Sequence, residues 1–183
     1  MKAYVTTIGE KTTDICCEQL KKFGFDVLVL RGDEPWLDKY KKFIISALQN
    51  VGDEGCLRID ADVVPNKEIK EVGMEAPNDA LISVYTLYDL YRNGLFLGSP
   101  IFYKKEAIEI IKKNLDKLNP LRPEASACRL PEINDKKFFS EVVVGMHGFF
   151  QDDIVIMRAR QNKEARGQID KFDFELVEKL VKL

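Results

Sequence analysis

The sequence predicts one α/β domain, built on a mostly parallel β-sheet with helices on both faces. Its 183 residues are enough for one substantial hydrophobic core. Apolar residues make up 45% of the chain and charged residues 32%, which is typical of a folded globular protein. Short apolar stretches alternate with helical patterns, and such β-α alternation with short connections predicts parallel strands covered by helices. We therefore expect a single domain over residues 1–183.

The first sixty residues contain three strand patterns separated by two helical ones. The expected strands cover residues 4–8, 25–30 and 56–59. The first expected helix begins at Thr12 or Thr13, whose hydroxyl can cap it, and is stopped by Gly24. The second has apolar residues at helical spacing over residues 36–49. The third strand runs directly into Asp60-Ala61-Asp62.

The remainder of the chain extends this pattern. We expect helices at residues 66–72 and 105–118, and strands at 80–85, 95–103 and 141–146. Residues 119–135 contain three prolines and predict a working loop rather than a simple connector. A short strand at 154–157 and an amphipathic helix over 174–181 are expected near the end of the chain.

Charge and composition exclude several classes of function. With 28 basic and 30 acidic residues the formal net charge is -2, so nucleic acid is not the expected partner. No apolar stretch approaches the roughly 20 residues that span a bilayer, so we expect no membrane span. The N-terminus lacks the pattern of a signal peptide, and the four cysteines lack metal-binding spacing. We therefore expect a cytoplasmic protein with reduced thiols.

The polar residues that follow the predicted strands are the first place to look for chemistry. In open α/β sheets, ligands bind beyond the carboxyl ends of the strands. These ends carry Thr6 to Lys11, then Asp33-Glu34, then Asp60-Ala61-Asp62. Two carboxylates one residue apart can share a divalent cation, and that cation can hold a diphosphate. Solvated aspartates at a strand end are the alternative, and the β-α units before the motif favour the binding site.

The same residues resemble a known family. A first strand ending in Thr6-Thr7, two β-α units and a strand closing in Asp60-Ala61-Asp62 are similar to the nucleotide-sugar-binding half of GT-A type glycosyltransferases. The stretch from Gly98 to Ala107 resembles the segment that these enzymes place beside the acceptor. His147, the one histidine of the chain, follows an apolar strand where many metal-dependent members complete their metal site. The resemblance divides the chain into a donor half, 1–100, and an acceptor side, 101–183.

The resemblance implies transfer of a sugar from a nucleotide-diphosphate donor, a UDP-sugar foremost, to a glycan or another hydroxyl acceptor. It implies Mn²⁺ or Mg²⁺ held by Asp60, Asp62 and His147, with Mn²⁺ tolerating the nitrogen ligand better. A structural histidine is the alternative for His147. The donor-binding residues implied in this way are Thr6, Thr7, Asp33, Asp60, Ala61 and Asp62.

Some neighbouring residues remain open alternatives. Glu34 could replace Asp33 beside the nucleoside, although Gly32 and Pro35 also favour a plain turn there. The donor phosphates could be reached by basic residues of the second helix, namely Lys39, Lys41 and Lys42.

The catalytic base of such an enzyme would be a carboxylate that takes the acceptor proton. The resemblance points to Glu124, in the stretch from Arg122 to Arg129. Here Ala125 stands where the family often has Asp, and the arginine comes early, so the stereochemical outcome stays open. Glu132 and Asp135 on the same segment are alternatives, as is a plain surface carboxylate.

Two other functions compete with the transferase. Asp60 also fits the nucleophile of haloacid-dehalogenase-like phosphatases, with Asp152-Asp153 as the late acidic pair, although that family opens its core with the motif strand. A non-catalytic nucleotide-sugar-binding domain is the third reading. Because the chain is short, we expect a shallow acceptor pocket, or one completed by a second subunit of a homo-oligomer.

Overall fold

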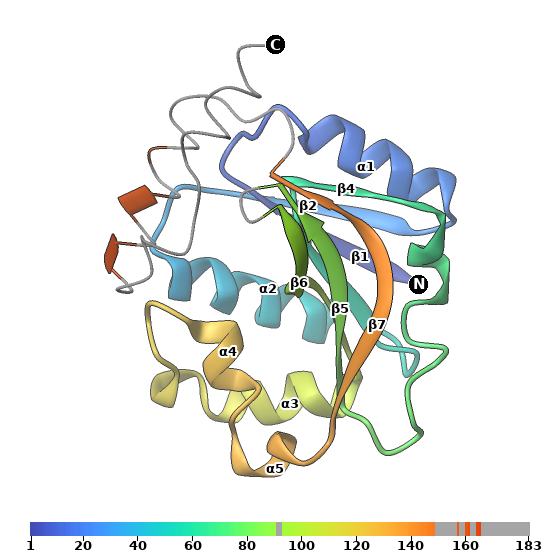
Figure 1. Cartoon of the computed structure of the whole chain (residues 1–183). Coiled ribbons are helices and arrows are strands. Elements are labelled where there is room, and N and C mark those ends of the chain that lie inside the picture. Colours follow the sequence, from blue (N-terminus) through green and yellow to red (C-terminus); the bar gives the residue numbers. More distant parts are fainter. Residues whose placement is uncertain (91–92, 149–156, 158–159, 162–163, 166–183) are drawn as a thin grey trace.

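The computed structural model describes residues 1–90, 93–148, 157, 160–161 and 164–165. Within these residues, seven strands form one sheet in the order β2-β1-β3-β6-β5-β7-β4 (Figure 1). The strands are β1 (Lys2–Thr7), β2 (Asp26–Arg31), β3 (Cys56–Asp60), β4 (Val63–Pro65), β5 (Ile82–Asp89), β6 (Gly94–Tyr103) and β7 (Lys137–His147).

The sheet is mixed, with one dominant strand direction. β1 pairs in parallel with β2 and β3, and β5 pairs in parallel with β7. β6 runs antiparallel to both β3 and β5, and β4 runs antiparallel to β7. Strands β1, β2, β3, β5 and β7 therefore share one direction, and the predicted mostly parallel sheet is confirmed.

Helices cover both faces of the sheet, as predicted. The helices are α1 (Thr13–Lys22), α2 (Trp36–Asn50), α3 (Lys105–Lys113), α4 (Pro123–Ala127) and α5 (Pro131–Asn134), with 3-10 turns η1 (Lys67–Glu71) and η2 (Leu115–Lys117). Figure 1 shows α1 on one side of the sheet and α2 to α5 on the other.

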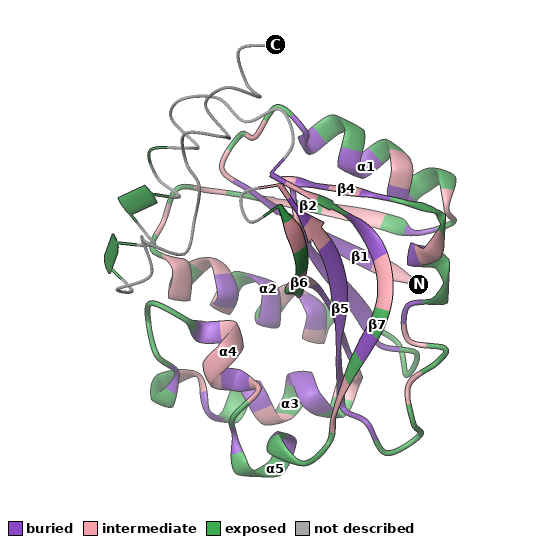
Figure 2. Ribbon diagram, viewed as in Figure 1, coloured by how far each residue is buried: buried purple, intermediate pink, exposed green. Residues whose placement is uncertain are grey.

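Each face of the sheet has its own buried core, and β1 contributes to both (Figure 2). Tyr4 packs edge-on against Phe43 of α2, with ring centroids 5.4 Å apart. Its neighbours Ala3 and Val5 point the other way, into the core that holds Leu20 of α1. The alternation of side chains along a strand explains why a strand buried on both faces reads as a continuous apolar run.

The segment predicted as a working loop folds differently. Residues 119–135 include the short helices α4 and α5, and each begins at a proline, Pro123 and Pro131. Proline suits the first helical position because that residue needs no backbone donor there. Two of the three prolines that indicated a loop therefore mark helix starts.

Three predicted helices also differ in detail. The predicted 105–118 helix ends at Lys113, where the Asn114 side chain donates to the carbonyl of Ile110 and a 3-10 turn follows. The predicted 66–72 helix is the 3-10 turn η1. The Thr12 hydroxyl donates to the carbonyl of Ala61 and does not cap α1.

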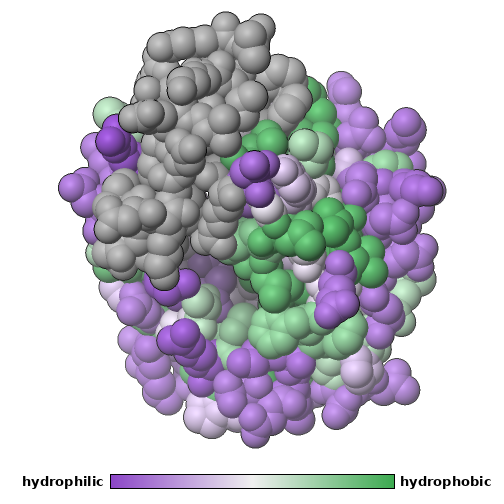
Figure 3. All heavy atoms as spheres, in the orientation of Figure 1, coloured by the Kyte–Doolittle hydropathy of each residue, from purple (hydrophilic) through white to green (hydrophobic). Residues whose placement is uncertain are grey.

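Some apolar side chains remain outside both cores. Leu95, Leu97, Phe139 and Met146, from β6 and β7, are exposed. Figure 3 shows hydrophobic side chains gathered on the face of the molecule over these strands. No helix in the described part of the chain has the length and apolar character to cross a membrane. The predicted strand residues 154–156 and the predicted helix at 174–181 lie outside the described residues.

Candidate functional site

A pocket of about 1100 Å³ opens at the carboxyl ends of β1, β2 and β3. Its wall contains seven of the residues that the sequence singled out, namely Thr6, Thr7, Asp33, Asp60, Asp62, Glu124 and His147. Ala61 lies buried below them, with its backbone N–H donating to the carbonyl of Thr6. Parallel strands bring residues from distant parts of the chain to this edge.

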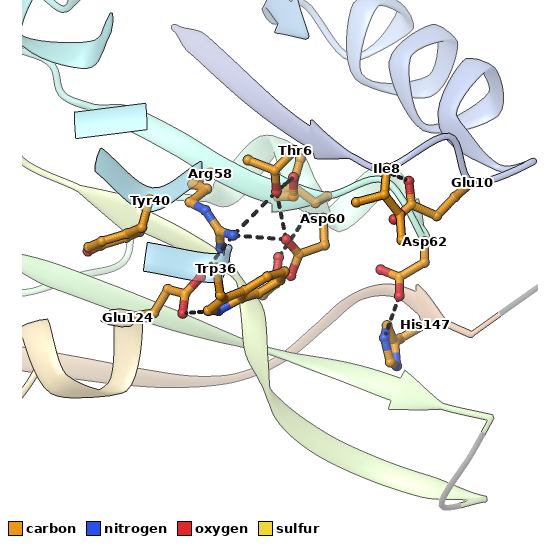
Figure 4. Close-up of polar contacts among 12 residues, drawn as sticks. Thr6, Ile8, Glu10, Trp36, Tyr40, Arg58, Asp60, Asp62, Glu124 and His147 are labelled. Atoms are coloured by element: carbon orange, nitrogen blue, oxygen red, sulfur yellow. Dashed lines mark hydrogen bonds and ion pairs between the residues drawn. The ribbon is translucent and has the colours of Figure 1, made fainter. Parts of the chain in front are cut away.

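Asp60 lies at the centre of the pocket wall, beside a buried arginine (Figure 4). Its Oδ1 accepts hydrogen bonds from the Thr6 hydroxyl at 2.7 Å and from Nη2 of Arg58 at 3.0 Å. The backbone N–H of Asp60 donates to Oγ of Ser99 at 2.8 Å. Asp60 is therefore held in place from both its side chain and its backbone.

Arg58 joins Asp60 to Glu124 across the pocket floor. Its side chain is 3% exposed, and its Nη2 also lies 2.9 Å from Oε1 of Glu124. Burial lowers the pKa of this guanidinium, but Asp60 and Glu124 more than offset that effect, so the pKa is raised and the group stays charged. We call Arg58, Asp60, Glu124, Thr6 and Trp36 the Arg58 cluster.

Glu124, the predicted base, has both carboxylate oxygens engaged within this cluster. Oε1 pairs with Arg58, and Oε2 accepts a hydrogen bond from Nε1 of Trp36 at 2.8 Å. Its side chain is 15% exposed and lies in the pocket wall. The alternatives Glu132 and Asp135 are exposed around α5, outside the pocket lining. A role for Glu124 as base stays a prediction.

Asp62 and His147 contact each other at a second point of the pocket wall. Nε2 of His147 lies 3.0 Å from Oδ2 of Asp62, and Nδ1 lies 3.3 Å from Oδ1 of Asp89. Burial lowers the pKa of His147, but Asp62 and Asp89 more than offset that effect and raise it to about 10. The two carboxylates therefore favour the protonated imidazole.

The backbone explains why Asp62 and His147 meet. The chain turns at Ala61 and enters the short strand β4, which pairs with the end of β7, so that Val63 lies opposite His147. The backbone N–H of Gly148 donates to the carbonyl of Asp62 at 3.1 Å. The adjacent strand pairing brings two side chains 85 residues apart in sequence to one place.

Glu10 adds a further carboxylate to this edge. Its Oε2 accepts hydrogen bonds from the backbone N–H of Ile8 and from the Thr7 hydroxyl. Burial raises the pKa of Glu10, and the nearby charge of Asp62 raises it further. Asp62 therefore has the carboxylate of Glu10 nearby as well as the imidazole of His147.

The predicted metal ligands do not form one group. Asp60 faces Arg58, whereas Asp62 faces His147 (Figure 4). Among the described residues, no three His, Cys, Asp or Glu side chains are arranged as a ready metal site. A carboxylate with an imidazole is nevertheless a donor pair that Mn²⁺ accepts, and diphosphate oxygens can supply further ligands. The donor set fits an ion that arrives with its nucleotide.

Some of the other residues predicted on the donor side line the pocket, and others do not. Asp33 lines the pocket, and so does Glu34, which pairs with Lys42. Of the three lysines of α2, Lys39 lines the pocket, while Lys41 pairs with Asp38 outside it. The predicted role of Lys39 at a donor phosphate therefore stays open, whereas Lys41 lies away from the pocket.

Sequence reasoning missed Arg58 and Trp36. A signal for Arg58 was present, because a charged residue inside a buried strand is rare unless it is paired. Arg122, Arg129 and Lys137 also line the pocket and had no assigned role.

Comparisons with known proteins give similarities of fold. No family model matches the sequence, and none of the curated proteins matches it. Among solved structures, A197 from STIV aligns with a TM-score of 0.47 at 16% identity, over 59% of this chain and 66% of that one. The chain thus spans slightly less than two thirds of A197.

Two further solved structures align with this chain at similar TM-scores and low sequence identity. The 4-diphosphocytidyl-2C-methyl-D-erythritol synthase from Anaerococcus prevotii DSM 20548 aligns with a TM-score of 0.49 at 12% identity, over 76% of this chain and 88% of that one. The apo-form glycosyltransferase GlyE of Streptococcus pneumoniae TIGR4 aligns with a TM-score of 0.42 at 8% identity, over 76% of this chain and 44% of that one. At such scores a functional conclusion has to come from the pocket itself.

Proposed function

We propose that this chain is a metal-dependent glycosyltransferase that binds a nucleotide-diphosphate sugar, a UDP-sugar foremost, and moves the sugar to a hydroxyl acceptor. The observation that carries the proposal is the 3.0 Å contact between Asp62 and His147 in the wall of a pocket of about 1100 Å³. Both were expected, from unrelated parts of the sequence, to bind the metal and diphosphate.

The proposal gives Asp62 and His147 the task of holding Mn²⁺ or Mg²⁺. A bound divalent cation neutralises charge on the leaving diphosphate. Thr6, Thr7 and Asp33 line the part of the pocket that would receive the nucleoside. Lys39 faces the same pocket and can donate to a phosphate oxygen.

Asp60 has a different role in this proposal from the one that the sequence predicted. Its Oδ1 accepts from both Thr6 and Arg58, so Arg58 competes with any metal for this oxygen. A carboxylate held in this way is well placed to accept a hydrogen bond from a sugar hydroxyl of the donor through Oδ2. Asp60 would then orient the donor, while Asp62 binds the ion.

Thermal unfolding tests nucleotide binding. We expect a UDP-sugar to raise the Tm in the presence of MnCl₂ and to have little effect without it. At about 100 times Kd, a ligand stabilises the folded state by about 2.7 kcal/mol, which corresponds to roughly 5–10 °C in a chain of this size. GDP- and CDP-sugars in parallel test the choice of base.

Two variants provide the control for this experiment. Asp62→Asn should abolish the Mn²⁺-dependent rise, whereas Asp38→Asn, the same change on the exposed part of α2, should leave it intact. If no nucleotide sugar raises the Tm with MnCl₂, or if Asp62→Asn responds like the unaltered chain, the proposal is wrong.

Turnover distinguishes the transferase from its two alternatives. Mn²⁺-dependent release of sugar from the nucleotide supports the transferase, whereas binding without release supports a non-catalytic domain. Hydrolysis of p-nitrophenyl phosphate that disappears in Asp60→Asn would instead support the phosphatase.

A further inference from the structure

The side chains that line the pocket differ in charge and polarity from one part of the wall to another. Asp62, His147 and Glu10 lie at one end, and Glu124 lies on the other side of Asp60 (Figure 4). Beyond Glu124 the wall is formed by residues around α4 and by the start of β7, and it is basic and apolar. The polar and charged residues there are Arg122, Arg129 and Lys137, and the apolar ones are Leu121 and Phe139.

Arg122 and Arg129 carry positive charge that no protein carboxylate neutralises within the described part of the chain. Both side chains are exposed, and neither forms an ion pair with a described Asp or Glu, in contrast to Arg58. Glu124, which follows Arg122 closely in sequence, has its two oxygens engaged by Arg58 and Trp36. These two guanidinium groups are therefore available to an anion.

The two arginines also border a small hollow of about 150 Å³ beside α4. The other residues of its lining are Asn119, Ala125 and Ser126, so the lining has two cations and no carboxylate. Guanidinium groups donate paired hydrogen bonds in the geometry of phosphate oxygens, which makes arginine the usual partner of such groups. The hollow therefore suits a phosphate in both charge and donors.

The large pocket that Arg122 and Arg129 line also has exposed apolar side chains in its lining. Leu97 and Phe139 are 46% and 52% exposed, although both are large apolar side chains. They extend from β6 and β7, where Thr86 and Val84 of the intervening strand β5 lie opposite them. Figure 3 shows the hydrophobic surface over these strands. A contiguous exposed apolar patch that is rimmed by polar residues often marks a ligand-binding groove.

We propose that this end of the pocket binds an amphipathic phosphate, with its phosphate on Arg122 and Arg129 and its apolar chain on Leu97 and Phe139. We call these four residues the α4 subsite. The identification of this ligand as the acceptor rests on the proposed function, because the subsite opens into the same pocket as the donor residues. The binding itself needs neither metal nor nucleotide.

The test measures the binding of n-octyl phosphate to the full chain by calorimetry, in the absence of metal ions. We expect one molecule to bind, with inorganic phosphate and 1-octanol each binding at least about tenfold more weakly, because each lacks half of the contacts. The double variant Arg122→Gln/Arg129→Gln should bind octyl phosphate at least about tenfold more weakly, because it lacks the charge-assisted hydrogen bonds of the two arginines. Lys112→Gln/Lys113→Gln, which removes two exposed charges from α3, should have no effect.

A second variant tests the apolar half of the subsite. Phe139→Ser should weaken the binding of octyl phosphate about fivefold and leave the binding of inorganic phosphate unchanged. Unaltered far-ultraviolet circular dichroism and Tm show that each variant folds, which we expect because the changed side chains are exposed.

Several results would overturn the inference. The first is that the arginine double variant binds octyl phosphate as tightly as the unaltered chain does. The second is that the unaltered chain binds 1-octanol as tightly as octyl phosphate. The third is that the chain binds only to vesicles that contain lipid phosphate, which would indicate a membrane surface. UDP with MnCl₂ is titrated into the same samples as a separate arm. If the unaltered chain binds UDP with MnCl₂ but does not bind octyl phosphate, the subsite is contradicted. If the unaltered chain binds octyl phosphate but not UDP with MnCl₂, the proposed function is contradicted.

Discussion

Asp60 and Asp62 are separated by one residue and contact different kinds of basic group. Asp60 shares a buried cation, Arg58, with Glu124, so two carboxylates surround one guanidinium. Asp62 contacts His147, which also contacts Asp89, and Glu10 lies close enough for the charge of Asp62 to raise its pKa. The basic group of the first is a guanidinium, which stays charged, whereas that of the second is an imidazole, a group that can lose its proton.

The difference arises from the turn at Ala61. Its backbone N–H donates to Thr6 and its carbonyl accepts from Thr12, so Asp60 ends β3 while Asp62 leaves toward β4. Two acidic residues at this spacing therefore need not bind one ion. In our proposal the Arg58 cluster holds side chains in place, and the Asp62 edge receives a cation.

The largest effect on stability is expected from breaking the Arg58 cluster. Arg58→Met leaves two carboxylates without their buried cation, and the free energy of unfolding should fall by about 3–5 kcal/mol. Urea unfolding followed by circular dichroism measures this change. Arg31→Met, at an exposed arginine of β2, is the control and should change it by less than about 0.5 kcal/mol. A loss below about 1 kcal/mol in Arg58→Met would show that the cluster does not stabilise the fold.

The next effect separates the two aspartates by function. Asp62→Asn should weaken Mn²⁺-dependent binding of UDP about 100-fold, because it removes an oxygen ligand of the ion. Asp60→Asn should weaken it about tenfold at most, since Arg58 already occupies its Oδ1. Calorimetry with UDP and MnCl₂ measures both constants. Equal losses in the two variants would contradict the division of roles.

A smaller effect is expected from removing the charge of Glu124. Glu124→Gln keeps an oxygen that can accept from Trp36 and loses the ion pair with Arg58, so the free energy of unfolding should fall by about 1–2 kcal/mol. The same urea titration measures it. An unchanged or increased stability would mean that Arg58 is satisfied by Asp60 alone.

The smallest effect concerns Glu10 and depends on pH. Because burial raises the pKa of Glu10, ionisation costs the folded state more than the unfolded one, so this residue destabilises the protein as pH rises through its raised value. Glu10→Gln should therefore raise the Tm at pH 7.5 by about 2 °C and have no effect at pH 4, below the pKa of the unfolded chain. Thermal unfolding at the two pH values measures the difference. An increase of the same size at both pH values would rule out ionisation as its cause.

Much of the fold could be predicted because its signals are local. Apolar runs located the strands, and the polar residues after β1, β2 and β3 were correctly expected at one edge of the sheet. The pairing of β4 with β7 could not be predicted, because β4 has three residues and its partner lies about 80 positions away. The prolines at 123 and 131 were misleading, since proline favours both loops and helix starts.

The sequence indicated several residues of the pocket wall, but not which of them contact one another. Asp60, Asp62, Glu124 and His147 all line the pocket, and their metal-binding and catalytic roles stay predictions. Their separation into two groups depends on Arg58, whose partners come from β3 and from α4. Spacing in the sequence carries no information on such a long-range contact.

The central claim is that Asp62 and His147 bind one metal ion together with a nucleotide diphosphate. Electron spin-echo measurements on Mn²⁺ and UDP bound to the protein report directly on nitrogen ligands of the ion. The account predicts a nitrogen coupling in the unaltered chain that changes when the protein is labelled with ¹⁵N and disappears in His147→Ala. A spectrum without nitrogen coupling, or one that is unchanged in His147→Ala, would contradict it.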